Sequence, residues 1–253
     1  MDIVIIGSGN VAAVLGRKLK AAGHTIAQVL SRNASAASAL AYEWDTESAN
    51  YMSLLNENAD IYLIAVADSA IAEVVKDLKL PGKVVAHTAG SVDKEILKNV
   101  TDHYGVFYPL QSLRKEMKGL PVIPLFFEGS DEKATKILES LANTIAPGQS
   151  APAGAGDRIK LHVAAVIVNN FTTHLYALAE EYCRKEGLDF RQLIPLIEET
   201  ALRLQTTSPS AVMTGPAIRN DQETIEKHLA LLEDYPQLQM FYNLFTRSIR
   251  QTK

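Results

Sequence analysis

Cysteine, tryptophan and long apolar runs are scarce in this sequence, and each scarcity excludes a class of protein. The 253 residues include one cysteine and one tryptophan. The lone Cys183 excludes an intramolecular disulfide and a cysteine-ligated metal cage, so we expect a cytoplasmic protein with no metal site. The apolar stretch Val163–Val168 is too short to span a bilayer. Because Met1 leads directly into an apolar segment with no basic region before it, we expect neither a signal peptide nor a membrane partner.

Positive charge is not in surplus either. The net charge is -4, the isoelectric point is about 5.9, and lysine and arginine do not cluster anywhere along the chain. A surface that binds nucleic-acid phosphates needs such a cluster, so we expect no nucleic-acid partner. Apolar residues make up 47% and charged residues 21% of the chain, which fits a globular protein of one large or two modest domains.

The first dozen residues carry the strongest local signal. Met1–Ile6 is an apolar, β-branched run typical of a buried parallel strand, and Val11–Ala22 has the periodicity of a helix. The turn between them has the pattern G-x-G-x-x-A, which lets a pyrophosphate approach the backbone at the N-terminus of a helix. The alternative is a glycine turn that only tightens the junction. The predicted dinucleotide site consists of Gly7, Ser8, Gly9, Asn10 and Val11.

The end of the next predicted strand, His24–Leu30, indicates which dinucleotide binds. An NAD site usually places an acidic residue here for the ribose 2′-hydroxyl, whereas a 2′-phosphate needs hydroxyl and guanidinium donors. Ser31 and Arg32 stand at this position, so we predict NADP as the cofactor. The alternative is a solvated loop that contains an arginine.

Two further buried strands are predicted, Ile61–Val66 and Lys83–Ala86. In open α/β sheets, ligands bind at the carboxyl ends of the strands. For His87 the alternative is a hydrogen-bonded histidine with no contact to the cofactor. The residues expected at this edge beside the cofactor are Ala67, Asp68, His87 and Thr88.

A loop rich in glycine, proline and alanine, Pro147–Gly156, marks the clearest boundary in the chain. Before it, we expect an α/β domain with a doubly wound parallel sheet over residues 1–152, although the polar segment Asp45–Asn58 has no clear pattern. After it, residues 153–253 are expected to be helical throughout. The predicted helices are Asp157–Glu186, Asp189–Gln205, Ser208–Met213, Asp221–Glu233 and Pro236–Gln251.

Polar residues form a stripe on the first of these helices. At about 100° per residue, Arg158, His162, Asn169, Thr173 and Tyr176 fall within roughly 40° of one line. A buried polar stripe needs a polar neighbour, and the nicotinamide end of the cofactor site is one candidate. His162 then donates a proton to the substrate and Asn169 holds its oxygen or nitrogen. The alternative is that the two side chains satisfy each other or a neighbouring helix.

A second polar group occupies Thr214–Asp221. Arg219 there offers a guanidinium suited to a carboxylate or phosphate, and Asp221 can cap the following helix. We predict that Arg219 anchors an anionic substrate group. The alternative is an ion pair with Asp221 that braces the loop.

Together these motifs resemble the Rossmann-like NADP oxidoreductases that carry the helical domain DUF2520, over essentially the whole chain. More distantly the chain is similar to pyrroline-5-carboxylate reductases, F420-dependent NADP reductases and β-hydroxyacid dehydrogenases. The resemblance implies a Rossmann domain and a C-terminal domain of the 6-phosphogluconate dehydrogenase type, with a small-molecule substrate between them. It rests on Gly7–Ala12, His87–Gly90, Tyr108–Gln111, His162–Phe171, and Thr214–Pro216 with Arg219, Asp221 and His228.

Two departures from these families affect the predicted chemistry. Where the DUF2520 family usually has His-Pro-Leu, this chain has Tyr108 before the proline, so Tyr108 takes any acid role of that histidine. The β-hydroxyacid dehydrogenases place a lysine and an asparagine on one helix face. Lys160 and Asn169 lie about 180° apart on a continuous helix, so we assign no catalytic lysine.

The leading hypothesis is an NADP-dependent reductase of a small carbonyl, imine or hydroxy compound, with His162, Asn169, Tyr108 and Arg219 as catalytic residues. The alternatives are an NADP(H)-binding sensor or scaffold without turnover, and an F420-linked reductase. We also expect a homodimer through the C-terminal helices, because Asp157–Glu186 carries more apolar residues than one buried face requires.

Overall fold

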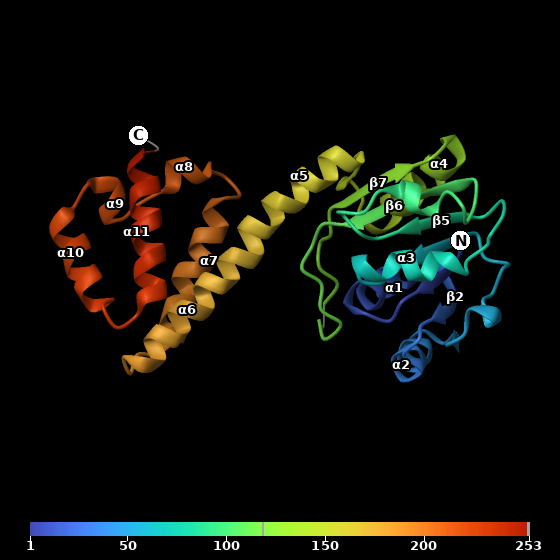
Figure 1. Cartoon of the computed structure of the whole chain (residues 1–253), viewed down its shortest axis with the longest axis horizontal. Coiled ribbons are helices and arrows are strands. Elements are labelled where there is room, and N and C mark those ends of the chain that lie inside the picture. The colour runs from blue at the N-terminus through green and yellow to red at the C-terminus, as the bar shows by residue number, and fades with distance from the viewer. Residues whose placement is uncertain (118, 252–253) are drawn as a thin grey trace. The chain divides into compact units, whose positions relative to one another are not determined.

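The computed structural model describes residues 1–117 and 119–251 (Figure 1). Within them, strands form one sheet of order β3-β2-β1-β4-β5-β6-β7-β8. Neighbouring strands are parallel except for the antiparallel pair β6 and β7. The predicted doubly wound sheet is therefore confirmed, with one reversal near its edge. The strands are β1 (Asp2–Ile6), β2 (Thr25–Leu30), β3 (Glu47–Ala49), β4 (Ile61–Ile64), β5 (Val84–His87), β6 (His103–Pro109), β7 (Leu125–Gly129) and β8 (Ser150–Pro152).

Apolar side chains cover both faces of this sheet, as the unbroken apolar run of β1 predicts. Ile3 and Ile5 join the cluster beneath helices α1 (Asn10–Ala21), α2 (Ala34–Trp44) and α4 (Glu132–Ile145). Val4 and Ile6 join a second cluster, which includes residues of α3 (Asp68–Lys76) and of the short 3₁₀ helix Lys94–Leu97. Alternation along a strand sends successive side chains to opposite faces, so a strand covered on both sides is apolar throughout.

The predicted helical C-terminal part is also confirmed. The chain divides into two compact units, residues 1–169 and residues 170 onward. No helix in the described part of the chain has the length and apolarity needed to cross a membrane. The boundary predicted between residues 152 and 153 stays a prediction. The helices are α5 (Ala155–Ala165), α6 (Thr172–Lys185), α7 (Ile194–Arg203), α8 (Pro209–Val212), α9 (Pro216–Arg219), α10 (Gln222–Leu231) and α11 (Pro236–Gln251).

Three local features differ from the sequence predictions. The unassigned segment Asp45–Asn58 contains β3 and the 3₁₀ helix Met52–Leu54. The segment Pro147–Gly156 was predicted to be a loop without strand structure. This prediction was wrong, because the segment contains β8, which pairs with β7. The single helix predicted from Asp157 to Glu186 is interrupted by a π-helix, Val166–Phe171, between α5 and α6. Because a π turn holds more residues than an α turn, it rotates everything after it about the helix axis.

Candidate functional site

A pocket of about 710 Å³ opens at the carboxyl ends of β1, β2 and β4. It lies at the edge of the sheet where ligands bind in open α/β folds. The structure brings most of the predicted cofactor residues together around it. The predicted residues that line the pocket are Gly7, Ser8, Gly9, Asn10, Val11, Ser31, Arg32, Ala67 and Asp68.

The two glycines of the first turn have different reasons to be glycine. Gly7 has φ +130°, and a Cβ there would lie 2.1 Å from the carbonyl oxygen of Ala65, so the fold itself requires glycine. Gly9 has φ -83°, and a Cβ there would meet no protein atom within 4 Å. The packing of the protein does not require Gly9, whereas a ligand that approaches the backbone in the pocket would.

The N-terminus of α1 faces this pocket without a capping side chain. Its N-cap residue is Gly9, no side chain accepts a hydrogen bond from the first turn, and that turn contains no acidic residue. By contrast, Asn33 caps α2 and Asp131 caps α4. Free N–H groups at a helix N-terminus bind anions. The arrangement therefore fits a phosphate or pyrophosphate group.

The end of β2 presents hydroxyl and guanidinium donors to the same pocket. The hydroxyl oxygens of Ser8 and Ser31 lie 2.8 Å apart, which links the first turn to the end of β2. Within the described residues, Arg32 is exposed and makes no hydrogen bond or ion pair. Across the pocket, the pKa of Glu73 lies below its usual value because Lys76 donates a hydrogen bond to it, and the charge of Arg32 adds a smaller effect. The guanidinium is available to a ligand.

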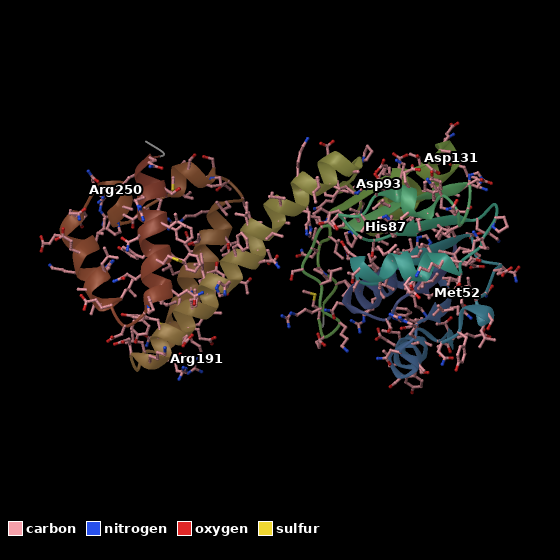
Figure 2. The ribbon with its side chains drawn as sticks, viewed as in Figure 1. Met52, His87, Asp93, Asp131, Arg191 and Arg250 are labelled. Carbon is pink, nitrogen blue, oxygen red and sulfur yellow. The ribbon has the colours of Figure 1, made fainter. Side chains whose placement is uncertain are left out.

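His87 and Thr88 are not among the residues that line the pocket. His87 and Asp93 lie close together in the first unit (Figure 2). The His87 ring is fully buried, its Nδ1 accepts a hydrogen bond from the N–H of Ala89, and its Nε2–H donates to the carbonyl of Asp93. Burial lowers the pKa of His87 to about 4, so the ring is neutral at pH 7. Thr88 donates its N–H and hydroxyl to Ile64. Both ring nitrogens hold the loop after β5, which fits the alternative of a hydrogen-bonded histidine, and the cofactor contacts of His87 and Thr88 stay predictions.

Tyr108 and His162, two of the predicted catalytic residues, lie in contact. The Tyr108 hydroxyl is 3.0 Å from Nδ1 of His162, and both residues belong to the first unit. Gly90 lies against the Tyr108 ring, because a Cβ at Gly90 would be 2.6 Å from Cζ of that ring. Burial raises the pKa of Tyr108, and the charge of Asp68 raises it further. At neutral pH the phenol is therefore protonated and can donate a proton. Its ring packs against the backbone of Gly90.

Asp68 connects this pair to the pocket at β1, β2 and β4. It is the first residue of α3, and its carboxylate accepts a hydrogen bond from the hydroxyl of Ser91. Because Ser91 directly follows Gly90, the carboxylate lies near the phenol end of Tyr108. The structure thus joins the pocket wall at Asp68 to the pair at Tyr108 and His162.

Arg158 is not among the residues that line the pocket, and its place on the predicted polar stripe was misleading. Its side chain is fully buried and donates to the carboxylate of Glu128 in β7. It also donates to the carbonyl oxygens of Ala153 and Val92, at 2.8 and 3.3 Å. Lys94 binds the same carboxylate at 2.7 Å. Arg158 therefore attaches the first turn of α5 to the sheet and to the loop after β5.

The other two predicted catalytic residues, Asn169 and Arg219, belong to other elements of the chain. Asn169 falls in the π-helical segment, whose turns displace it from the line through His162 that a continuous α-helix would give. Arg219 is the last residue of α9 in the second unit. Their roles stay predictions. Glu128 was missed by sequence reasoning, because a lone glutamate in a short strand carries no distinguishing pattern.

The comparisons with known proteins match this arrangement. The model of a Rossmann-like domain matches residues 1–111, and the model of the domain of unknown function DUF2520 matches residues 123–249. No curated protein sequence matches the chain.

Solved structures give full-length matches. A Bacteroides fragilis protein, provisionally named an NADP oxidoreductase, is 37% identical with a TM-score of 0.89, and the match covers 99% of this chain and 98% of that one. A pyrroline-5-carboxylate reductase from Streptococcus pyogenes is 14% identical with a TM-score of 0.68, covering 99% and 98%. An imine reductase from Myxococcus stipitatus, in complex with NADP⁺, is 15% identical with a TM-score of 0.68, covering 99% and 93%. The last two show similarity of fold alone. The chain belongs to the DUF2520 family, with a Rossmann-like domain preceding the DUF2520 domain.

Proposed function

We propose that this protein binds NADP(H) in the pocket at β1, β2 and β4 and transfers a hydride between it and a small carbonyl, imine or hydroxy compound. The observation that carries the proposal is the combination of the open Gly9 position and the uncapped helix α1 with Ser31 and Arg32. The Bacteroides fragilis relative, provisionally named an NADP oxidoreductase, supports the same cofactor.

In this proposal each part of the pocket has one task. The backbone from Gly7 to Val11 holds the pyrophosphate, and Ser31 and Arg32 hold the 2′-phosphate. Ala67 and Asp68 border the nicotinamide ribose. The bound cofactor supplies or accepts the hydride.

In the proposed reaction, the pair formed by Tyr108 and His162 donates the proton that the substrate needs when it accepts the hydride. When the Tyr108 hydroxyl donates to Nδ1, the neutral His162 ring carries its hydrogen on Nε2 and offers it to the substrate. When the ring is protonated, Nδ1–H donates to the Tyr108 oxygen and Nε2–H is a stronger acid. The half-buried position of His162 leaves it reachable by a small molecule. Asn169, Arg219 and a substrate position between the two domains remain predictions.

The experiment is calorimetric titration of the full chain with NADPH and with NADH. We expect tighter binding of NADPH, and Arg32→Ala should remove that preference, because losing a charged hydrogen bond costs about 1.5–3 kcal/mol, or roughly ten- to a hundred-fold in affinity. Arg191→Ala, an exposed arginine of the second unit, is the matched control and should bind as the wild type does. Absence of binding by either nucleotide would refute the proposal.

A second candidate is an NADP(H)-binding sensor or scaffold without turnover. The tyrosine at the position where the family usually has histidine favours it. Steady NADPH consumption with a panel of small carbonyls and imines, lost in His162→Ala, would reject this candidate.

We also propose that the chain forms a homodimer through its C-terminal helices. Among the described residues of the second unit, the buried apolar side chains are Cys183 and Ile225, whereas many large ones are exposed. A unit with so small a core needs a partner surface. A monomer by light scattering would contradict this. The exposed residues include Leu188, Leu196, Leu202, Leu204, Leu231, Met240, Leu244 and Phe245.

A further inference from the structure

Asp68, Ser91, Tyr108 and His162 form one polar cluster beside the cofactor pocket, here called the substrate-end cluster. Ser91 donates to Asp68, and Tyr108 lies 3.0 Å from His162. Gly90 joins the two halves, since a Cβ at Gly90 would lie 2.6 Å from Cζ, the ring carbon that carries the Tyr108 hydroxyl. The cluster therefore places a carboxylate close to the proton donor of the proposed reaction.

The charge of this carboxylate is not neutralised locally. Asp68 has no cationic group within ion-pair distance among the described residues, and its hydrogen-bond donor, Ser91, is neutral. Asp68 is also exposed and lines the pocket, so its charge reaches the space that a ligand would fill.

Arg32 lines the same pocket but is assigned to the 2′-phosphate, and two other positive groups, Arg158 and Lys94, are already paired. Arg158 and Lys94 both bind the carboxylate of Glu128, and Lys94 also forms an ion pair with Glu95 at 3.8 Å. His87 is neutral at pH 7 because burial lowers its pKa to about 4. Asp68 thus supplies a negative charge to the substrate-end cluster, which opposes an anionic ligand and favours a cationic one.

We propose that Asp68 makes this site selective for a cationic substrate, a protonated imine or iminium ion, over a neutral ketone or a carboxylate-bearing carbonyl compound. The inference rests on the proposed function and narrows its substrate class. In the balanced step, the carbon of the C=N⁺ group accepts the hydride from NADPH and the π electron pair moves to nitrogen. The products are an amine and NADP⁺. A neutral imine first takes its proton at nitrogen, from Nε2 of His162 or from solvent, and the Asp68 charge stabilises the resulting cation.

The test compares a permanent cation with a neutral ring of the same size. The probes are 1,2-dimethyl-1-pyrrolinium and 2-methylcyclopentanone, each assayed for NADPH consumption by the full chain. We expect the wild type to reduce the cation. Asp68→Asn should lower kcat/KM for the cation about ten- to a thousand-fold, since an opposite charge within about 4–6 Å is worth 1–3 pKa units. Any change that the same variant causes in ketone turnover or in the Kd of NADPH, whose pocket Asp68 lines, should be several-fold smaller than its effect on the cation.

Two further variants separate charge from other effects. Ser91→Ala keeps the Asp68 charge and removes its hydrogen bond, so the preference for the cation should persist. Asp157→Asn removes an exposed carboxylate of the same unit that pairs with Lys160, and it should match the wild type in every assay.

A binding measurement keeps the inference separate from turnover. N-methylpyrrolidinium, the cation of a cyclic tertiary amine, is titrated into the protein with and without NADP⁺ and should bind wild type more tightly than Asp68→Asn. Equal binding by both proteins, an equal loss of ketone turnover, or a loss of NADPH affinity that accounts for the whole effect would each overturn the inference. Failure of NADPH binding in the wild type would instead refute the proposed function.

Discussion

The ion pair between Arg158 and Glu128 gives the sharpest prediction about stability. The Arg158 side chain has 0% relative exposure, and Glu128 is the one carboxylate bonded to it among the described residues. Nε of Arg158 is buried without a partner, so one donor of the guanidinium is unsatisfied even while the ion pair is intact. Lys94, which also binds Glu128, is 21% exposed and can turn toward water. The substitution Glu128→Gln therefore leaves one buried cation, Arg158, without an anionic partner, because Lys94 can turn toward water.

Breaking a buried ion pair by neutralising one partner typically costs about 3–5 kcal/mol. We expect the lower end, about 3 kcal/mol, because the carbonyl oxygens of Ala153 and Val92 still accept hydrogen bonds from Arg158. For a unit of this size, each kcal/mol shifts the Tm by roughly 2–4 °C, so Glu128→Gln should lower it by roughly 6–12 °C.

The single tryptophan provides the assay. Trp44 is buried in the core of the first unit, so its fluorescence on heating reports the unfolding of that unit alone. Lys160→Met breaks the exposed ion pair with Asp157 on the same helix and is the matched control, with no expected shift. A shift below about 2 °C for Glu128→Gln would refute the reasoning, because the Arg158 charge would then be stabilised without Glu128.

The same pair predicts a dependence on pH. Burial by itself raises the pKa of Glu128, but hydrogen bonds from Lys94 and Arg158 outweigh it and bring the pKa below the ordinary value of 4.5. A carboxyl group with a lowered pKa in the folded state stabilises the protein above its unfolded pKa, and this contribution is lost as the pH falls through the folded value. The Tm difference between wild type and Glu128→Gln should therefore be constant near neutral pH and shrink below about pH 4.5.

Three other substitutions and one titration test single residues. Gly7→Ala should lower the Tm, because the new Cβ would clash with the carbonyl oxygen of Ala65. Gly9→Ala should keep the Tm and lose NADPH affinity, because the new Cβ would enter the open pocket. Equal losses of Tm in the two variants would contradict this. Tyr108→Phe should lower kcat at an unchanged Kd for NADPH, because His162 loses the partner of its Nδ1, and unchanged kcat would remove Tyr108 from the proton path. By NMR, His87 should remain neutral down to about pH 5; because its pKa is lowered, its contribution to stability falls between pH 6.5 and about 4, and titration near 6.5 would contradict its burial.

Local sequence signals were sufficient for the central strands and poor for the edge strands. β4, and β1 after its first residue Asp2, are apolar because helices cover both faces of the sheet there. β3 has the sequence Glu-Ser-Ala and β8 the sequence Ser-Ala-Pro, so neither contains an apolar run. Each exists because a longer neighbour offers it a row of hydrogen bonds, and pairing of this kind leaves no trace in three residues.

The cofactor pocket was predicted more completely than the substrate end for a related reason. A glycine turn and the residues after β2 act through their own backbone and position, which sequence spacing fixes. The partners of His162 and Asp68 come from distant parts of the chain, Tyr108 and Ser91, and only the fold brings them together.

Arg158 and His162 show how far a helical pattern can be interpreted. They are four residues apart, so the prediction that they share one face of the helix was sound. From that face, Arg158 reaches Glu128 in β7 and His162 reaches Tyr108 in β6. One side chain thereby fixes the helix to the sheet while the other remains half-buried beside the pocket. Periodicity identifies the face that a residue shares, but the depth of the neighbouring surface decides whether it anchors the helix or meets a ligand.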